Sequence, residues 1–286
     1  MSLLDPPPTV VREIVSRALA EDLDEHGDLT TLAVVPADAR GRATFVARAD
    51  GVLAGTAVAT EVLARVDAEL ICRWSAADGD PLTAGCAFGG VEGSLRSILT
   101  AERTALNLLT HCSGVATLTR RFVDAAGGGA EIRDTRKTLP GLRALEKAAV
   151  RAGGGRSHRA SLSESVLVKD NHLACTPLAA AVAQARAAWP GRVIEVECDT
   201  LDQVEEAREA APDLVLVDNM TPGRVAEAVR ILDGAIPVEV SGGVTLDTVS
   251  AYAAAGAEYV SVGAITHSAP SLDLALDVVA TEPEDT

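Results

Sequence analysis

The sequence contains few lysines, aromatic residues and cysteines, and these scarcities exclude several kinds of function. Only 3 of its 25 basic residues are Lys, and aromatic residues make up 2%. So few aromatic rings argue against a surface that stacks nucleic-acid bases. The five cysteines are dispersed and form no CxxC pair, so we expect reduced, buried thiols and neither a disulfide framework nor a zinc site.

The chain also lacks the features of a membrane-bound or secreted protein. No apolar run approaches the roughly 20 residues that span a bilayer. The first residues, MSLLDPPPTV, lack the basic start and apolar run of a secretion signal. A formal net charge of −16 makes a broad basic face for nucleic acid unlikely to form. We therefore expect a soluble, cytoplasmic protein that binds neither nucleic acid nor membrane.

Against this acidic background, one segment is basic. Residues 133–173 contain all three lysines, Lys137, Lys147 and Lys169, and carry nine basic and four acidic side chains, a local charge of +5. Arg is used almost everywhere else, so a retained Lys indicates a need for a compact ammonium group. A small basic island in an acidic chain predicts a compact anionic ligand.

The second half of the chain alternates apolar, β-branched runs with Ala-rich helical segments between residues 130 and 264. This alternation indicates a parallel sheet covered by helices. The expected strand ends at Glu197, Asp218, Ser241 and Gly263 recur about every 22 residues, as in (β/α) barrels, whose functional residues lie at the carboxyl ends of the strands. We predict an α/β fold with an incomplete TIM-like (β/α) barrel.

The first half has a mixed α+β pattern and predicts a separate domain. We expect an N-terminal α+β open-sandwich domain at residues 1–112 and the barrel at residues 113–268. Residues 269–286 are expected to form a C-terminal helix and tail that pack on the N-terminal domain. Gly114 is a plausible stop for the long helix that begins near Ser94.

Two glycine-containing loops predict a phosphate site. Backbone N–H groups in such loops, and at a helix beginning near Thr245, would point at an anion. A Gly-Gly pair alone is often only a turn, but two such loops after successive strands match the phosphate grip of TIM barrels. The predicted phosphate-binding residues are Ser241, Gly242, Gly243, Val262, Gly263 and Ala264.

Charged side chains at the other strand ends complete the candidate site. Glu197 and Asp218 suit Mg²⁺ held directly or through water, or hydrogen bonds to ribose hydroxyls, although they could instead balance neighbouring cations. Arg binds carboxylates in bidentate fashion and Lys supplies a point charge. Lys147, inside a helix, is better explained as structural. The candidate receptor for a small dianion consists of Arg136, Lys137, His158, Arg159 and Lys169.

Several motifs in order resemble the quinolinate phosphoribosyltransferases, the decarboxylating nicotinate-nucleotide pyrophosphorylases of NAD synthesis. The resemblance runs from about residue 20 to residue 268. Two departures from the family pattern are Ala148, where an aromatic residue is frequent, and Ser157, where Asn is frequent. The motifs are EDLDEHGDLTT, LTAERTALNLLTHCSGVAT, DTRKTLPGLRALEKAAVRAGGGRSHR, LVKDNHL, IEVECDTLDQ, LVLVDNM, SGGV and SVGAITHS.

The resemblance implies that quinolinate and 5-phosphoribosyl 1-diphosphate give nicotinate mononucleotide, pyrophosphate and CO2, with Mg²⁺ as cofactor. It implies catalytic roles for Lys137, Lys169, Glu197 and Asp218, the last two stabilising positive charge on the ribose directly or through Mg²⁺. Arg103 would bind a substrate carboxylate from a neighbouring subunit, so a homodimer or a higher oligomer is expected. The resemblance also adds Thr135 and His267 to the substrate-binding residues.

Other functions fit parts of the pattern. A paralogue of the same fold could use nicotinate or be associated with molybdenum transport, although the intact KDNH motif with Lys169 argues against the latter. A Schiff-base aldolase would use Lys169 as its nucleophile but gives no reason for the Arg and His cluster. A metabolite-binding protein without catalytic activity would need neither Glu197 nor Asp218.

Overall fold

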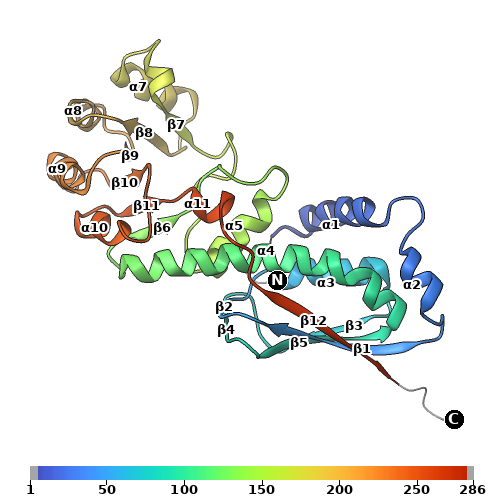
Figure 1. Cartoon of the computed structure of the whole chain (residues 1–286). Coiled ribbons are helices and arrows are strands. Elements are labelled where there is room, and N and C mark those ends of the chain that lie inside the picture. Colours follow the sequence, from blue (N-terminus) through green and yellow to red (C-terminus); the bar gives the residue numbers. More distant parts are fainter. Residues whose placement is uncertain (1–5, 282–286) are drawn as a thin grey trace. The chain divides into compact units, whose positions relative to one another are not determined.

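The computed structural model describes residues 6–281, which divide into two compact units (Figure 1). Within this range the first unit comprises residues 6–118, 139–154 and 268–281, and the second comprises residues 119–138 and 155–267. The first change from one unit to the other, between residues 118 and 119, falls inside the helix α4 (Leu95–Ala126). The units differ from the expected domains because the segment 139–154 belongs with the first unit.

The first unit is built on an antiparallel sheet of four strands in the order β12–β1–β5–β3. Burial alternates along β1, with Ala43, Phe45 and Ala47 inside, so one face of the sheet packs on a core. The rings of Phe45, Trp74 and Phe88 lie 4.7 to 6.1 Å apart within this unit. The strands are β1 (Arg40–Ala47), β3 (Ile71–Trp74), β5 (Ala87–Ser94) and β12 (Leu274–Thr281), and a separate pair is formed by β2 (Gly51–Val52) and β4 (Pro81–Leu82).

Helices of this unit follow the amphipathic segments of the sequence. The segment TAVATEVLARV forms α3, with Val58, Val62 and Leu63 buried. The helices that lie wholly in the first unit are α1 (Pro8–Leu23), α2 (Leu29–Val34), α3 (Thr56–Val66) and α5 (Arg143–Ala152). The first unit therefore has the predicted α+β character.

Two predictions in this unit are wrong. The expected C-terminal helix is the strand β12, which pairs with β1, because Leu272, Leu274 and Leu276 are buried at every second residue. Gly114 does not end a helix, since α4 continues to Ala126. It instead allows the backbone of Pro270 to approach, because a Cβ at position 114 would lie 2.1 Å from the Pro270 carbonyl oxygen.

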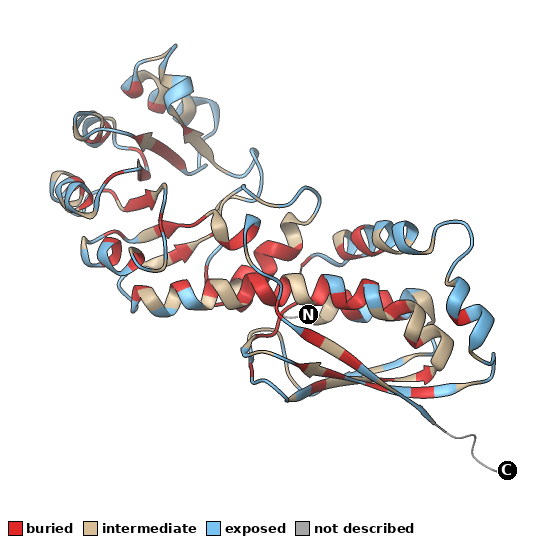
Figure 2. Ribbon diagram, in the orientation of Figure 1, coloured by how far each residue is buried: buried red, intermediate tan, exposed pale blue. Residues whose placement is uncertain are grey.

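The second unit is a six-stranded parallel sheet in the order β6–β11–β10–β9–β8–β7. Its central strands are almost wholly buried, whereas the helices that follow them expose one side (Figure 2). β6 and β7 are the two edges, so the sheet does not close and the prediction of an incomplete TIM-like barrel is confirmed. The strands are β6 (Glu131–Arg133), β7 (Val166–Val168), β8 (Ile194–Cys198), β9 (Leu214–Asp218), β10 (Val238–Ser241) and β11 (Tyr259–Ser261).

Each of the strands β7 to β10 is followed by at least one helix, which returns the chain to the same end of the sheet for the next strand. The helices are α6 (Asp170–Leu173), α7 (Leu178–Ala188), α8 (Leu201–Ala210), α9 (Pro222–Leu232), α10 (Val249–Ala254) and α11 (Ala264–His267). Because all six strands run in the same direction, their carboxyl ends lie at the same end of the sheet. Among residues 6–281, no helix combines the length and apolar character needed to cross a membrane.

Candidate active site

A cavity of about 370 Å³ opens at the carboxyl ends of the strands in the second unit. Nine of its lining residues were predicted from the sequence: Thr135, Arg136, Lys137, His158, Arg159, Lys169, Glu197, Asp218 and Ser241. The parallel register explains why these distant positions meet, since Ser241 on β10 is paired directly with Asp218 on β9. The loops after β6 and before β7 supply Arg136, Lys137, His158 and Arg159, and Lys169 directly follows β7.

Lys169 and Glu197 form an ion pair on one side of the cavity, and the charge of Asp218 acts on Glu197. Lys169, directly after β7, donates a hydrogen bond to Glu197 at the end of β8. Burial raises the pKa of Glu197, and the neighbouring charges of Asp218 and Asp199 raise it further, while Lys169 acts in the opposite direction. Two carboxylates are therefore held close enough to repel one another, and an added cation would relieve that repulsion.

Guanidinium groups gather on another part of the lining. Arg159 donates from Nη1 to the backbone oxygen of Ser165 at 2.9 Å, which fixes the side chain. Burial, followed by the charge of Arg136, lowers the pKa of Arg159. Like charges crowded in this way stabilise a bound anion, and planar guanidinium groups suit carboxylates.

Lys137 is positioned by contacts within its loop and with the segment after β11. Its backbone N–H donates to Thr135 Oγ1 at 2.9 Å, and its carbonyl accepts from Thr266 Oγ1 at 2.8 Å. A Cβ added at Gly263 would lie 3.1 Å from Lys137 Cδ and 3.2 Å from His267 Nε2. The loop that was predicted to hold phosphate therefore borders Lys137, although its own residues do not line the cavity.

The segment after β10 differs from the prediction. Gly242 and Gly243 have φ of +92° and +62°, which glycine adopts readily, and a Cβ at Gly242 would lie 2.3 Å from Asn219 Oδ1. The helix expected near Thr245 is α10, which begins only at Val249. A helix N-terminus at Thr245 therefore plays no part in this turn, and the prediction of one was wrong.

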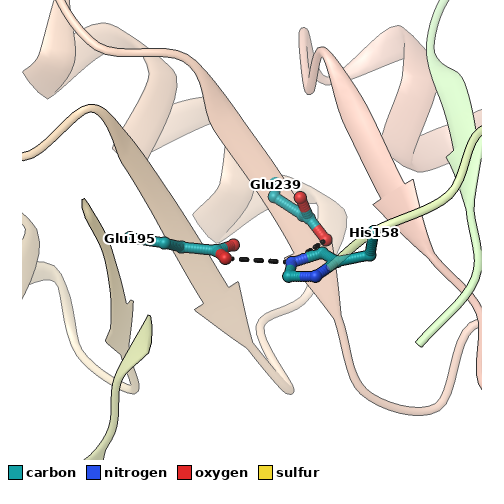
Figure 3. A group of neighbouring side chains, drawn as sticks. All are labelled: His158, Glu195 and Glu239. Carbon is teal, nitrogen blue, oxygen red and sulfur yellow. Dashed lines mark hydrogen bonds and ion pairs between the residues drawn. The ribbon is translucent and has the colours of Figure 1, made fainter. Parts of the chain in front are cut away.

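His158 points toward two buried carboxylates (Figure 3). Its Nε2 lies 2.9 Å from Glu195 Oε2 and 3.6 Å from Glu239 Oε1, and 11% of its side chain is exposed. Sequence reasoning missed both carboxylates, as well as Ser261. A signal existed in IEVEC and VEVS, because Glu195 and Glu239 interrupt buried strands two residues before Glu197 and Ser241 and so share their face.

Some predicted residues do not line this cavity. Arg103 lies on α4 in the first unit, where 65% of its side chain is exposed and its nearest acidic neighbour is Glu102 at 4.0 Å. Lys147 is buried within α5 of the first unit, as its structural interpretation requires. The remaining predicted residues outside the lining are Gly242, Gly243, Val262, Gly263, Ala264 and His267.

A second cavity of about 500 Å³ shares Arg159 with the first and extends along Leu162, Trp189 and Arg192. Its lining contains no carboxylate. It therefore lacks groups that could hold a cation or stabilise a developing positive charge. The smaller cavity, with both signs of charge, is the better candidate for a reaction centre.

Known protein families match nearly the whole chain. Residues 28–113 match the N-terminal domain of quinolinate phosphoribosyl transferase, and residues 115–277 match its C-terminal domain. The chain is 44% identical over 275 residues to the nicotinate-nucleotide pyrophosphorylase (carboxylating) of Mycobacterium leprae (strain TN), covering 93% of this chain and 96% of the relative. It is 38% identical over 291 residues to a decarboxylating quinolinate phosphoribosyltransferase of Nicotiana tabacum, covering 94% of this chain and 82% of the relative.

Solved structures agree with these similarities. The structure of the nicotinate-nucleotide pyrophosphorylase from Francisella tularensis superposes with a TM-score of 0.93 at 35% identity, covering 98% of this chain and 100% of the other. The corresponding structure from Ehrlichia chaffeensis gives a TM-score of 0.89 at 36% identity, covering 93% and 98%. Human nicotinic acid phosphoribosyltransferase, with a TM-score of 0.63 at 14% identity, covers 88% and 72% and shares the fold alone.

Proposed function

The chain belongs to the quinolinate phosphoribosyltransferase family, and we propose that the charged cavity of its second unit is where quinolinate reacts with 5-phosphoribosyl 1-diphosphate. The enzyme is a decarboxylating phosphoribosyltransferase of NAD biosynthesis. Its products are nicotinate mononucleotide, pyrophosphate and CO2. The alternative of a paralogue with another substrate has no comparable support.

The observation that carries the site assignment is the meeting of opposite charges around one cavity. Arg136 and Arg159 are crowded together, while Glu197 and Asp218 lie at the ends of neighbouring strands. An anionic acceptor would bind at the cationic part, and positive charge that develops on the ribose would be stabilised at the carboxylates. The larger cavity that shares Arg159 has no carboxylate in its lining.

We assign the substrate contacts accordingly. Arg136, His158 and Arg159 would hold the two carboxylates of quinolinate, so that the ring nitrogen faces the anomeric carbon. Lys137 and Lys169 would neutralise charge on the anionic reactants as pyrophosphate leaves. The 5-phosphate would bind at residues 241–243 and 262–264, whose loops border Lys137 and Asn219.

Mg²⁺ fits the donor set of this cavity. Glu197 and Asp218 provide hard oxygen ligands, and Lys169 pairs with Glu197. Mg²⁺ usually binds through one or two carboxylates and keeps water and substrate oxygens as its other ligands. When bound, it would offset negative charge on the departing pyrophosphate.

We further propose that Arg103 acts in the active site of a second copy of the chain. Its side chain is 65% exposed, and its guanidinium lies 4.0 Å from the carboxylate of Glu102. An arginine so placed is able to reach a ligand on another molecule. The functional unit would then be at least a homodimer, with each dianion contacted by both chains.

The proposed substrates can be tested by following pyrophosphate release in the presence of Mg²⁺. Quinolinate together with 5-phosphoribosyl 1-diphosphate should give continuous release, and neither compound alone should do so. A binding protein without activity would show no release. A Schiff-base aldolase would instead be trapped covalently by borohydride in the presence of a carbonyl substrate.

A further inference from the structure

Asn219, the residue that directly follows β9, has an unusual backbone conformation for its place in the fold. Its φ is +55°, in the left-handed region that non-glycine residues rarely adopt. Across the described part of the chain, the other three non-glycine residues with positive φ, Asp24, Ala211 and Asp233, cap the C-terminal ends of helices. Asn219 instead lies at the carboxyl end of a strand, next to Asp218, which lines the cavity.

The backbone of Asn219 is held from both sides. Its N–H donates to the carbonyl oxygen of Ser241 at 2.9 Å, which continues the pairing of β9 with β10 by one residue (Figure 1). The next residue, Met220, is buried, and its carbonyl oxygen accepts from the Tyr252 hydroxyl at 3.1 Å. Because the strand before Asn219 and the residue after it are both fixed, the turn keeps its left-handed conformation.

The side chain of Asn219 contacts the carboxylate that precedes it. Its Nδ2 group donates a hydrogen bond to Asp218 Oδ2. A carboxylate that accepts a hydrogen bond from a fixed donor loses freedom to rotate, so its two oxygens point in defined directions. The bond uses Oδ2 and leaves the other oxygen, Oδ1, for a ligand in the cavity that Asp218 lines.

The same amide lies against the loop that follows β10. A Cβ added at Gly242 would lie 2.3 Å from Asn219 Oδ1, 2.6 Å from Asn219 Cγ and 2.7 Å from its backbone nitrogen. Gly242 also has a φ of +92°, so both the backbone conformation and the lack of space require glycine. Asn219 and the loop of residues 241–243 are therefore closely packed, and the position of one limits the position of the other.

One side chain thus connects two parts of the site proposed for 5-phosphoribosyl 1-diphosphate. In that proposal Asp218 acts on the ribose and residues 241–243 bind the 5-phosphate. The ribose and its 5-phosphate belong to one molecule, so covalent bonds set the distance between them. Protein groups that bind such a ligand at two points must be held at a matching distance, within about 0.5 Å.

Resting on the function proposed above, we infer that Asn219 is a positioning residue for the ribosyl donor: its amide orients the Asp218 carboxylate and holds it in a fixed place relative to the loop of residues 241–243. Asn219 is not among the residues that line the cavity, so it acts through its neighbours. Asn tolerates the left-handed backbone and carries an N–H donor, whereas Asp at this position would place a second negative charge beside Asp218.

Asn219→Gly tests the inference, because glycine adopts the left-handed backbone without strain and only the side chain is lost. We expect kcat/KM for 5-phosphoribosyl 1-diphosphate to fall by about ten- to a hundredfold, the effect of losing a hydrogen bond to a charged group. Quinolinate affinity, measured by calorimetry without the donor, should stay at the wild-type value. Ala211→Gly is the matched control, since it places glycine at the left-handed C-terminal cap of α8 and should change neither quantity.

A double-mutant cycle separates positioning from a general structural effect. If Asn219 acts through Asp218, Asn219→Gly should cause a much smaller loss of kcat/KM in an Asp218→Ala background than in the wild type. Asn219→Asp, which has nearly the same shape but lacks the N–H donor, provides a second variant with the same expectation in the wild-type background. An equal loss in both backgrounds, or wild-type kcat/KM in Asn219→Gly, would overturn the inference.

Failure of this inference can be told apart from failure of the proposed function. A wild type that releases no pyrophosphate would contradict the proposed function and leave Asn219 to be judged by ligand-free crystal structures. In Asn219→Gly the Asp218 carboxylate should rotate from its wild-type orientation or adopt two orientations, and in Ala211→Gly it should not. A wild-type orientation of Asp218 in Asn219→Gly would overturn the inference, whatever the activity.

Discussion

At the scale of single residues, two of the three lysines line one cavity and the third does not. Lys137 and Lys169 approach it from the loops after β6 and β7, whereas Lys147 is buried inside α5 of the first unit. Each of the two ammonium groups at the cavity would neutralise charge on the anionic reactants, so its removal should affect the transition state strongly.

We predict that Lys137→Ala and Lys169→Ala each reduce kcat/KM by at least about a hundredfold, equivalent to roughly 2.7 kcal/mol of transition-state stabilisation. Steady-state kinetics with quinolinate would measure the loss. Arg208→Ala, which removes an exposed cation on α8, is the matched control and should leave activity near the wild-type value. Wild-type rates for both lysine variants would remove the basis of the site assignment.

The same residues predict a strong preference for quinolinate over nicotinate, which lacks the carboxylate next to the ring nitrogen. Nicotinate would offer one carboxylate fewer to the positive charges of Arg136, Arg159 and Lys169. Sites built to bind a polar group can reject an analogue that lacks it by about 10⁴ or more. Competition kinetics with both acids would measure the ratio, and similar specificity constants would contradict a dianion site.

Polar residues at strand ends could be predicted from the sequence because each directly follows a run of apolar residues and differs from them in polarity. Glu197, Asp218 and Ser241 were found in this way and do line the cavity. Glu195 and Glu239 were missed, since each lies within an apolar run and its partners come from segments distant in the sequence. His158 contacts both carboxylates, and Arg133 and Ser261 also contact Glu239. These contacts depend on the fold and leave no local signal.

At the scale of secondary-structure elements, the parallel strands were predictable because both of their faces are buried, which selects continuous β-branched runs. The C-terminal strand β12, preceded by Leu272 and containing Leu274 and Leu276, was wrongly predicted to be a helix. Their spacing of two residues was the signal for a strand, and pairing with β1 decides the outcome.

Gly114 shows how a local signal can mislead, and it yields a prediction. In Gly114→Ala, the added Cβ would lie 2.1 Å from the carbonyl oxygen of Pro270, so either α4 or the segment before β12 must shift. We expect a loss of roughly 1 to 3 kcal/mol in the free energy of unfolding, measured by urea denaturation.

The matched control is Gly223→Ala near the start of α9, where an added Cβ meets nothing within 4 Å. Because Ala favours helix more than Gly, this variant should be unchanged or more stable by up to about 1 kcal/mol. A Gly114→Ala protein as stable as the control would show that the close approach to Pro270 has no energetic consequence.

At the scale of the whole molecule, the proposed dimer can be tested through complementation. Arg103→Ala chains and Lys169→Ala chains should each be nearly inactive alone. If Arg103 acts on the partner's site, mixed dimers contain one site with both residues intact and regain part of the activity. Mixing under conditions that exchange subunits, followed by the pyrophosphate assay, would measure the recovery.

Hybrid dimers demonstrated by native mass spectrometry but devoid of activity would place Arg103 in its own chain's site or outside any site. The same experiment with two chains that both carry Lys169→Ala is the control, because no hybrid then has a complete site. Neither the sequence nor the single chain could supply this information, since residues that act across an interface acquire their role only in the assembly.

The central claim is that the cavity transfers a phosphoribosyl group to quinolinate with loss of one carboxylate. The most direct measurement is the product stoichiometry from quinolinate labelled with ¹³C in the carboxylate next to the ring nitrogen, together with 5-phosphoribosyl 1-diphosphate and Mg²⁺. We predict pyrophosphate, nicotinate mononucleotide and labelled CO2 in equal amounts. Pyrophosphate release without labelled CO2, or mononucleotide formation from nicotinate at a comparable rate, would contradict it.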